Sequence, residues 1–529
     1  MHRRTLFRAG AGLAAAGLAA PGLAQPARAT TLRFVPQANL AALDPIWTTA
    51  IVTQMHGYHI YDTLFAMDGQ LRPQPQMAEG HEVSADGRAW RIRLREGLRF
   101  HDGEPVRAQD CAASLARWSR RDPFGQILAE RVDEWRAADD RTLEIRLKRP
   151  FALMLQALAK PDANVPFIIP ERLARTDANT QVAEMVGSGP FRFVRGEFVS
   201  GSRVVYEKFD GYRPRSEPAD GASGGKVAHF QRVEWHILPD PATASAALQA
   251  GEVDWLDQPL PDLIPTLQRN RNIQVDVLNP YGIMSIMRLN HLQAPFNDQA
   301  TRQAVALSVD QEEYMRATLG DDRSVWRVCR SLFPCGTPLG TEDLSPVNAP
   351  PRSLDRARAA LQASRYNGER VVIINPTDFP LIGPHGQVTA DRLRRIGFNV
   401  ELVETDWGTV VQRRVRTQPV DQGGWSIFHT YGSALAYLNP AVSSLVKGQG
   451  PTGWFGWYTS PRAQELVEAF LDAPDAERQL AVSNELNKLA QDDVATVPLG
   501  QFTMRTAWRR NITGHLKGSM PYPWGVRPA

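Results

Sequence analysis

Cysteine is scarce in this chain, with three residues among 529. Cys329 and Cys335 lie close together in a loop bounded by proline and glycine, where a small disulfide can close; two unpaired thiols that point apart are the alternative. Cys111 falls on the apolar face of an expected helix and is predicted to be a buried, inert thiol. This spacing offers too few ligands for a zinc site, so we expect no bound metal.

Long hydrophobic runs and an excess of charge of one sign are also missing. After the N-terminal segment, no stretch reaches the roughly 18 uninterrupted apolar residues of a membrane span. Four of the 60 basic residues and none of the 57 acidic residues fall within the first 29 positions, so the rest of the chain is close to neutral. This balance gives no reason to expect nucleic acid or an anionic membrane surface as a partner.

Sequence signatures of catalysis are absent or incomplete. Residues 221–225 satisfy G-x-S-x-G, but a proline-rich stretch precedes them where a nucleophile elbow requires a strand. Residues 187–189 lack the third glycine of a dinucleotide-binding loop. His56 and His59 could share a metal on one helix, but two ligands do not make a site. We therefore expect neither an enzyme nor a cofactor.

The first 29 residues are typical of an export signal. Arg3 and Arg4 precede a run rich in alanine, glycine and leucine, and Ala27-Arg28-Ala29 offers an A-x-A cleavage site. The paired arginines resemble a twin-arginine signal, and a general secretory signal is the alternative. No cysteine stands at the cleavage site, so no lipid anchor is expected. We predict cleavage near Ala29 and a mature protein in the bacterial periplasm.

What the chain does contain is a well-defined strand, turn and helix at residues 91–110. Ile92 and Leu94 alternate with arginines, which is the pattern of a half-buried strand. His101-Asp102-Gly103 is suited to a turn, and a helix is expected after Pro105. At 529 residues, the chain is too long for one hydrophobic core, so we expect two or three domains.

The sequence LREGLRFHDGEPVRAQD in this stretch resembles the signature of the family 5 extracytoplasmic solute-binding proteins. These are the peptide/nickel-type binding components of ABC importers, similar to dipeptide- and oligopeptide-binding proteins. Further landmarks of the family follow in the expected order along nearly the whole mature chain. They are Leu43-Asp44-Pro45, Tyr61-Asp62-Thr63-Leu64, Gly187-Ser188-Gly189-Pro190-Phe191, Gly251-Glu252-Val253-Asp254 and the segment from Leu289 to Glu313.

The resemblance implies an α/β fold of the two-lobed periplasmic binding protein type (type II, large cluster C form). It further implies an extra domain in the first lobe and two hinge crossovers. On this basis the first lobe takes domain I (30–53, 183–280 and 496–529) and extra domain II (54–182), and domain III (281–495) forms the second lobe. Alternation of helices and strands after Leu289 predicts a largely parallel sheet in that lobe.

The function implied is capture of a short peptide or peptide-like small molecule in a cleft between the lobes and delivery to the permease subunits of an ABC transporter. We expect a monomer. The same fold could instead bind an opine, a metal chelate or another organic acid. A secreted hydrolase and a periplasmic chaperone are the alternatives from other functional classes.

Candidate ligand contacts in the second lobe come from its aromatic residues. Trp425, His429 and Tyr431 are concentrated in one short segment, and large flat rings suit a ligand wall. The alternative is that these rings pack the core of the lobe, and the same two possibilities apply to residues 454–458. In the family, peptide binders place an aspartate shortly after this tryptophan to pair with the peptide amine. Here no acid follows Trp425.

Another acid could supply the missing charge, since a buried ammonium without a carboxylate partner is costly. Asp378, followed by Phe379, comes after a predicted second-lobe strand and is our candidate, with a plain turn-forming aspartate as the alternative. In the first lobe, the predicted contacts are Asn39 and Trp47, and Tyr281 lies near a predicted crossover. These three follow from topology alone.

Overall fold

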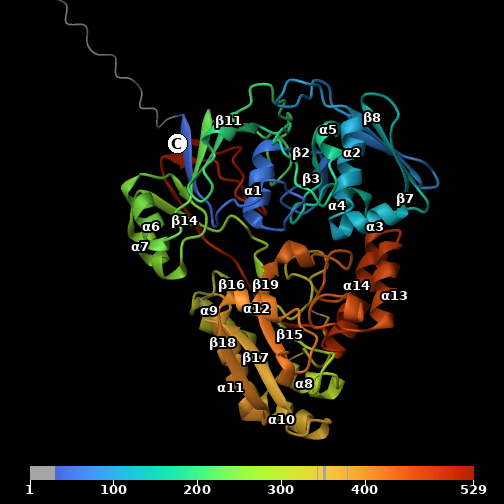
Figure 1. The fold of residues 1–529 in the computed structure, drawn as a ribbon, viewed down its shortest axis with the longest axis vertical. Coiled ribbons are helices and arrows are strands. Elements are labelled where there is room, and N and C mark those ends of the chain that lie inside the picture. Colours follow the sequence, from blue (N-terminus) through green and yellow to red (C-terminus); the bar gives the residue numbers. More distant parts are fainter. Residues whose placement is uncertain (1–29, 342, 350–352, 378) are drawn as a thin grey trace, which may run out of the picture.

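The computed structural model describes residues 30–529 apart from 342, 350–352 and 378. Two lobes, each built around a β-sheet, stand one above the other in Figure 1. The predicted export signal at residues 1–29 lies outside the described residues. Within the described part of the chain, no helix has the length and apolar character needed to cross a membrane.

The first lobe contains a seven-stranded sheet whose central strands run parallel. Its order is β10-β11-β12-β1-β13-β21-β14, and β1 pairs in parallel with both β12 and β13. The strands are β1 (Thr31–Val35), β10 (Phe191–Phe193), β11 (Arg203–Lys208), β12 (Arg232–His236), β13 (Trp255–Leu256), β14 (Ile273–Asp276) and β21 (Thr506–Arg509).

Helices cover both faces of this sheet, and β1 contributes apolar side chains to both. Leu32 and Phe34 pack with α1 (Ile51–Ile60), while Val35 packs with α6 (Pro241–Ala250) and α7 (Ile264–Arg269). The ends of α6 follow from its sequence. Asp240 accepts a hydrogen bond from the backbone N–H of Thr243, and Gly251 ends the helix in the left-handed conformation.

A second part of the first lobe carries a four-stranded antiparallel sheet of order β5-β6-β8-β7. Its strands are β5 (Ala78–Val83), β6 (Ala89–Leu94), β7 (Val132–Ala137) and β8 (Thr142–Leu147), flanked by α2 (Ala108–Trp118) and α3 (Pro123–Arg131). The predicted alternation is confirmed, since Ile92 and Leu94 are buried while Arg91 and Arg93 are exposed. Cys111 is buried on α2, also as predicted.

Short elements complete the first lobe. They are β2 (Asp62–Thr63) paired with β9 (Phe167–Ile168), β3 (Phe65–Met67) paired with β4 (Pro73–Pro75), β22 (Ile512–Thr513) paired with β23 (Arg527–Pro528), and the helices α4 (Met154–Leu158) and α5 (Glu171–Ala174).

The second lobe contains a six-stranded mixed sheet of order β16-β20-β15-β19-β17-β18. Its strands are β15 (Ile283–Leu289), β16 (Trp326–Arg327), β17 (Arg370–Pro376), β18 (Asn399–Thr405), β19 (Ile427–Ser433) and β20 (Val497–Phe502). Two of its five strand pairs, β17–β18 and β17–β19, are parallel and the other three are antiparallel, so the prediction of a largely parallel sheet was wrong. The central strand β15 enters from the first lobe and pairs antiparallel on both sides.

The helices of the second lobe are α8 (Gln299–Ser308), α9 (Gln311–Leu319), α10 (Leu354–Ala363), α11 (Gly383–Ile396), α12 (Trp407–Arg413), α13 (Pro461–Leu471) and α14 (Ala476–Asp492). The strand β20 differs from the boundary drawn from the sequence. Residues 496–529 were assigned to the first lobe, but β20 pairs with β15 and β16 in the second-lobe sheet. The chain returns to the first lobe only at β21.

Two crossings connect the lobes. Residues 277–282 run from β14 to β15, and residues 503–505 run from β20 to β21. The side-chain amide of Gln501 donates a hydrogen bond to the backbone carbonyl of Tyr281 at 2.7 Å, which ties the two crossings together. Gly282 has φ 71°, and a Cβ there would lie 2.2 Å from the carbonyl oxygen of Phe502. Close approach of the crossings therefore requires glycine at this position.

Candidate ligand-binding site

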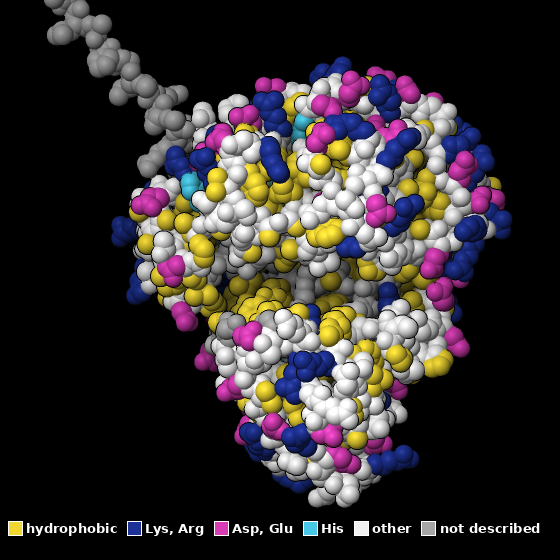
Figure 2. Space-filling model, in the orientation of Figure 1, with side chains coloured by type: hydrophobic (Ala, Val, Ile, Leu, Met, Phe, Trp, Pro, Cys, Tyr) yellow, Lys and Arg dark blue, Asp and Glu magenta, His cyan; other side chains and the backbone are white. Residues whose placement is uncertain are grey.

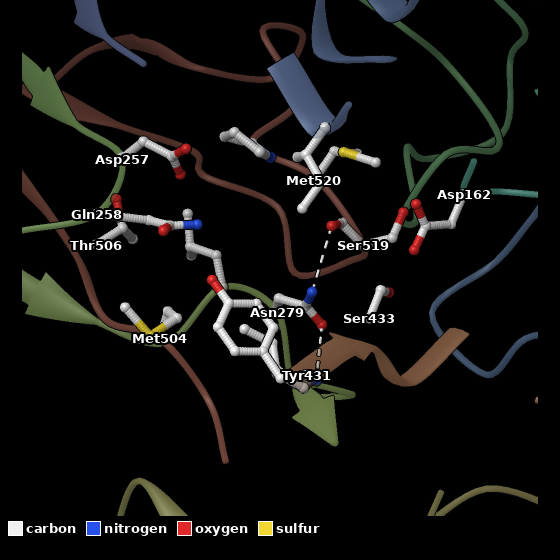
Figure 3. A pocket seen from close by; sticks show the side chains of 15 residues that line it. Asp162, Asp257, Gln258, Asn279, Tyr431, Ser433, Met504, Thr506, Ser519 and Met520 are labelled. Carbon is white, nitrogen blue, oxygen red and sulfur yellow. Dashed lines mark hydrogen bonds between the residues drawn. The ribbon is translucent and has the colours of Figure 1, made fainter. Parts of the chain in front are cut away.

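A hollow separates the two lobes in the space-filling view, with hydrophobic side chains along its lower edge (Figure 2). Beside the crossings it narrows to a cavity lined from both lobes (Figure 3). We call this the inter-lobe cavity. Its lining includes Asp162, Asp257, Gln258, Asn279, Tyr431, Ser433, Met504, Thr506, Ser519 and Met520.

The volume of the inter-lobe cavity is about 90 Å³. Pockets for small ligands start near ~300 Å³, so this cavity by itself is too small for a whole peptide. A wider space of about 520 Å³ lies between residues 259–268 of the first lobe and residues 316–325 of the second. The lobes are therefore in contact near the crossings and apart beside them.

Asp257 reaches the inter-lobe cavity from the end of a parallel strand. It directly follows β13, and its backbone N–H donates to the carbonyl of Val35 at the end of β1. Ligands in open α/β sheets bind outside the carboxyl ends of parallel strands, which is where this residue lies. An adjoining cavity at the same strand ends shares Gln258 and is otherwise lined by residues 35–39, 237–239, 241, 244, 256 and 259.

The charged residues that line the inter-lobe cavity are all acidic. Its lining contains two carboxylates, Asp162 and Asp257, and no lysine, arginine or histidine. Asp257 is 8% exposed, and burial raises its pKa to about 7, although a hydrogen bond from the backbone of Gln37 acts against this rise. Among the described residues, no cation lies within 4.0 Å of the Asp257 carboxylate to form an ion pair.

Asn279 fixes the shape of the first crossing at the floor of this cavity. Its side-chain carbonyl accepts hydrogen bonds from the backbone N–H groups of Tyr281 and Gly282, both at 3.1 Å. Its amide donates to the carbonyl of Ser519 at 3.3 Å (Figure 3). The C-terminal segment is thereby held against the hinge.

Of the predicted second-lobe contacts, Tyr431 lines the inter-lobe cavity. It lies on β19, and its ring packs edge-on against Phe379 with ring centroids 5.6 Å apart. Phe379 also contacts Trp407, at 5.3 Å, so it supports the Tyr431 ring. Asp378 lies outside the described residues.

Trp425 does not line the inter-lobe cavity. Its side chain is fully buried with Phe428 and Trp457 in a separate apolar cluster, and its indole N–H donates to the carbonyl of Arg414 at 3.1 Å. In this structure Trp425 therefore occupies a core position, which was the alternative to ligand contact. In the strand that follows, Ile427, Phe428 and His429 are buried in the lobe, whereas Tyr431 reaches the cavity.

His429 is also inside the second lobe rather than at the cavity. Its Nε2 lies 2.8 Å from the hydroxyl of Thr389, which in turn bonds the hydroxyl of Tyr314 at 2.9 Å. Burial, together with the neighbouring His385, holds the pKa of His429 well below its ordinary value. In this structure His429 is thus buried in the core of the lobe and does not line the inter-lobe cavity.

The predicted first-lobe contacts and Tyr281 do not line the inter-lobe cavity. The side chain of Asn39 accepts a hydrogen bond from the backbone N–H of Gly201 at 2.8 Å and lines the adjoining cavity at the strand ends. Trp47 is 37% exposed, beneath the guanidinium of Arg121. The hydroxyl of Tyr281 donates to the carbonyl of Gly69 at 2.8 Å, which ties the crossing to the first lobe.

Cys329 and Cys335 form a disulfide in the structure. The backbone N–H of Cys335 donates to the side chain of Gln501 at 2.9 Å, so the closed loop lies against β20 beside the hinge. The serine of the G-x-S-x-G segment, Ser223, donates its hydroxyl to the carbonyl of Asp220 in a turn and has no histidine partner among the described residues. Across those residues, no group of three or more histidine, cysteine or acidic side chains is placed to hold a metal.

Sequence reasoning missed Asp257, Asn279, Ser519 and Met520. Asp257 could have been found, since it stands just after the recognised segment Gly251–Asp254 and at the carboxyl end of a strand. Ser519 and Met520 carry no comparable signal, because they reach the cavity only through the return of the C-terminal chain to the first lobe.

Comparison with known proteins agrees with this architecture. A family model described as "Bacterial extracellular solute-binding proteins, family 5 Middle" matches residues 72–449. The chain is 38% identical over 531 residues to a probable peptide ABC transporter periplasmic-binding protein of Sinorhizobium fredii, covering 100% of this chain and 99% of that protein. It is 25% identical over 494 residues to the glutathione-binding protein GsiB of Escherichia coli, covering 90% of each.

Solved structures share the fold at low identity. A dipeptide-binding protein of a Pseudoalteromonas species in complex with Met-Leu has a TM-score of 0.74 and 17% identity, covering 94% of this chain and 100% of that one. NikA of Brucella suis in complex with Fe(III)-EDTA has a TM-score of 0.78 and 18% identity, with the same coverage.

Proposed function

Because the chain belongs to the bacterial extracellular solute-binding proteins of family 5, we propose that it captures a short peptide or peptide-like small molecule between its lobes and delivers it to an ABC permease. The family resemblance drawn from residues 91–110 is confirmed by this membership. The observation that carries the proposal is the inter-lobe cavity, to which both lobes, both crossings and the C-terminal segment contribute.

The mechanism is hinge closure, with the two crossings as the only connections between the two large sheets in the described chain. A ligand that contacts both lobes favours the closed form by its differential affinity for that form, and closure creates the surface that a permease can recognise. No bond chemistry is needed. The buried turn position of Ser223 supports a binding protein over a hydrolase.

A peptide is favoured over the other ligand classes by the relatives. A relative at 38% identity is named as a peptide transporter component, and more distant ones are named for glutathione, itself a tripeptide. The core position of His429 further weakens the case for a metal chelate. An opine or another organic acid would meet two carboxylates and no cation in the inter-lobe cavity, which disfavours an anion there.

The domain division is part of the proposal, with one boundary moved. Sheet membership supports domain I at 30–53, 183–280 and 503–529, extra domain II at 54–182, and domain III at 281–502. We also propose export to the periplasm by the signal at residues 1–29, of twin-arginine type or, as the alternative, of the general secretory type. The mature protein would act as a monomer without a lipid anchor.

The test is a thermal-shift screen of the mature chain, starting at Thr30. The panel contains alanine peptides of two to five residues, Met-Leu, glutathione, opines and nickel chelates. A ligand that binds the folded state raises the melting temperature, and the stabilisation reaches about 2.7 kcal/mol at a hundred times the dissociation constant. We expect shifts with peptides. Shifts confined to the opines or chelates would overturn the peptide assignment.

A further inference from the structure

The inter-lobe cavity holds a buried carboxylate that its surroundings do not neutralise. Asp257 is 8% exposed, and the most deeply buried aspartates of this protein have a cationic partner. Asp44 lies 2.7 Å from Arg117, and Asp62 lies 2.7 Å from Lys226. Asp257 has no such partner among the described residues, so its charge is available to whatever enters the cavity.

The position of Asp257 is fixed by the backbone. Its N–H donates to the carbonyl of Val35, which holds it at the ends of β1 and β13, and its carboxylate accepts a hydrogen bond from the backbone of Gln37. The lining of the cavity contains no lysine, arginine or histidine. Figure 3 shows the Asp257 carboxylate at one end of the cavity and Asp162 at the other, with Asn279 and Tyr431 between them. Preorganisation of this kind lowers the cost of binding, because the side chain need not be ordered by the ligand.

Asp162 is the other carboxylate of the cavity, and like Asp257 it is buried and accepts a backbone hydrogen bond, from Ala163 at 2.8 Å. Asp257 differs from it in standing at the carboxyl ends of parallel strands, where ligands bind in open α/β sheets. A metal ion is a poor occupant, because the two carboxylates stand at opposite ends of the cavity and oxygen-binding cations take six or more ligands. A compact organic cation needs one carboxylate and a few hydrogen-bond acceptors, and can leave its carbon chain against Met504 and Met520.

We infer that Asp257 binds a primary ammonium group of the ligand, so that a first-lobe residue supplies the acid that the segment after Trp425 lacks. This inference rests on the proposed function because it assumes that the ligand binds in the inter-lobe cavity. It makes Asp257 a specificity-determining residue, since a ligand without a cation leaves a buried carboxylate unpaired on closure. The cavity therefore selects ligands that carry a positive charge at the end that meets Asp257.

The experiment is calorimetric titration of the mature chain and of Asp257→Asn with matched probes. One panel holds Ala-Ala-Ala, Met-Leu and glutathione, each with a free and with an acetylated amine. A second panel holds the non-peptide amines cadaverine and agmatine. Glu252→Gln is the control, because it removes an exposed carboxylate five residues before Asp257, outside the cavities between the lobes, with the same change of net charge.

We expect at least one free-amine probe to bind the wild type, with acetylation or Asp257→Asn each weakening it at least tenfold. Once the amine is acetylated, Asp257→Asn and the wild type should agree within twofold, and Glu252→Gln should match the wild type with every probe. Equal binding of free and acetylated peptides would overturn the inference and leave the proposed peptide function standing. If only cadaverine or agmatine binds, and Asp257→Asn abolishes this binding, the inference stands and the proposed peptide function is overturned. A wild type that binds no cationic probe overturns the inference.

Discussion

The guanidinium of Arg131 in the first lobe lies 3.2 Å from the carboxylate of Asp472 in the second. Arg131 ends α3 and Asp472 follows α13, and Figure 1 shows these helices facing each other far from the crossings. Glu468 lies 3.4 Å from the same guanidinium, and Arg149 reaches both acids. These lobe-to-lobe ion pairs form only while the lobes are together.

Removal of both acids should favour the open form. In Glu468→Gln/Asp472→Asn, Arg131 would remain buried without a charged partner when the lobes meet, and opening would return it to water. Because both acids are about half exposed, we expect a loss of only about 1 kcal/mol from the closed form, or roughly fivefold in peptide affinity. Calorimetry measures the affinity, and small-angle scattering measures the radius of gyration of the ligand-free protein, which should rise.

Glu465→Gln is the matched control for this change. Glu465 lies on the same helix, but its ion pair at 2.9 Å is with Arg462 inside the second lobe. It should alter neither affinity nor radius. If the double variant behaves like Glu465→Gln, the lobe-to-lobe ion pairs do not contribute to closure.

Asp257→Asn should stabilise the ligand-free protein at alkaline pH. The pKa of Asp257 is raised from 3.8 to about 7 by burial, so its contribution to stability is present below pH 4 and is lost as the pH rises through 7. At pH 8 the folded protein carries a buried, ionised carboxylate, and its removal should raise the free energy of unfolding by about 2 kcal/mol, allowing for water in the cavity. At pH 4 the gain should nearly vanish.

Urea denaturation at both pH values measures this difference, with Asp262→Asn as the exposed control. Equal stability of Asp257→Asn and wild type at pH 8 would mean that the carboxylate is well solvated in the open protein. The prediction also separates two roles of this side chain, since the same substitution should lower the affinity for cationic ligands and raise the free energy of unfolding.

Trp425→Ala should destabilise the protein strongly, because the indole is fully buried against Phe428 and Trp457. Removing a buried tryptophan leaves a cavity and costs about 3–5 kcal/mol. Thermal unfolding without ligand should show a large fall in melting temperature, whereas Tyr431→Phe, which keeps a ring at the inter-lobe cavity, should show little change. A near-normal melting temperature for Trp425→Ala, combined with weak peptide binding, would restore Trp425 as a ligand contact.

Trp425 also shows where sequence reasoning reaches its limit. The alternation around Ile92 predicted which face of β6 is buried, because a two-residue period is a local property of the chain. An aromatic residue after two glycines has no such pattern, and the same ring could face a ligand or a core. Only the packing of distant segments around Trp425, which contribute Ile374, Val410 and Trp457, decides between them.

Sheet membership of β20 was unpredictable for a related reason. All six residues of this strand are buried, so its sequence does not indicate which face or which sheet it joins. Its place is set by pairing with β15, more than two hundred positions earlier in the chain. The family motifs therefore located the lobes, while the ends of the crossings and the residues at the cavity depended on these long-range contacts.

The last prediction concerns the disulfide Cys329–Cys335, which lies beside the hinge. Cys329–Cys335 closes a short loop, and Cys335 donates a backbone hydrogen bond to Gln501, whose amide in turn donates to the carbonyl of Tyr281. Closing a loop of this length stabilises a protein by about 2 kcal/mol. Cys329→Ser/Cys335→Ser should lose about that amount in urea denaturation, whereas Cys111→Ala serves as the control for a thiol outside the bridge.

Thiol counting on the denatured, unreduced mature protein tests the bridge itself. One reactive thiol, that of Cys111, is the expected count for the wild type, and three would mean that the loop is open in the purified protein. Since Gln501 connects the loop to the first crossing, reduction should also loosen the hinge. Hydrogen exchange at residues 279–283 should therefore be faster in the double serine variant and unchanged in Cys111→Ala. Unchanged exchange in both would confine the disulfide to global stability.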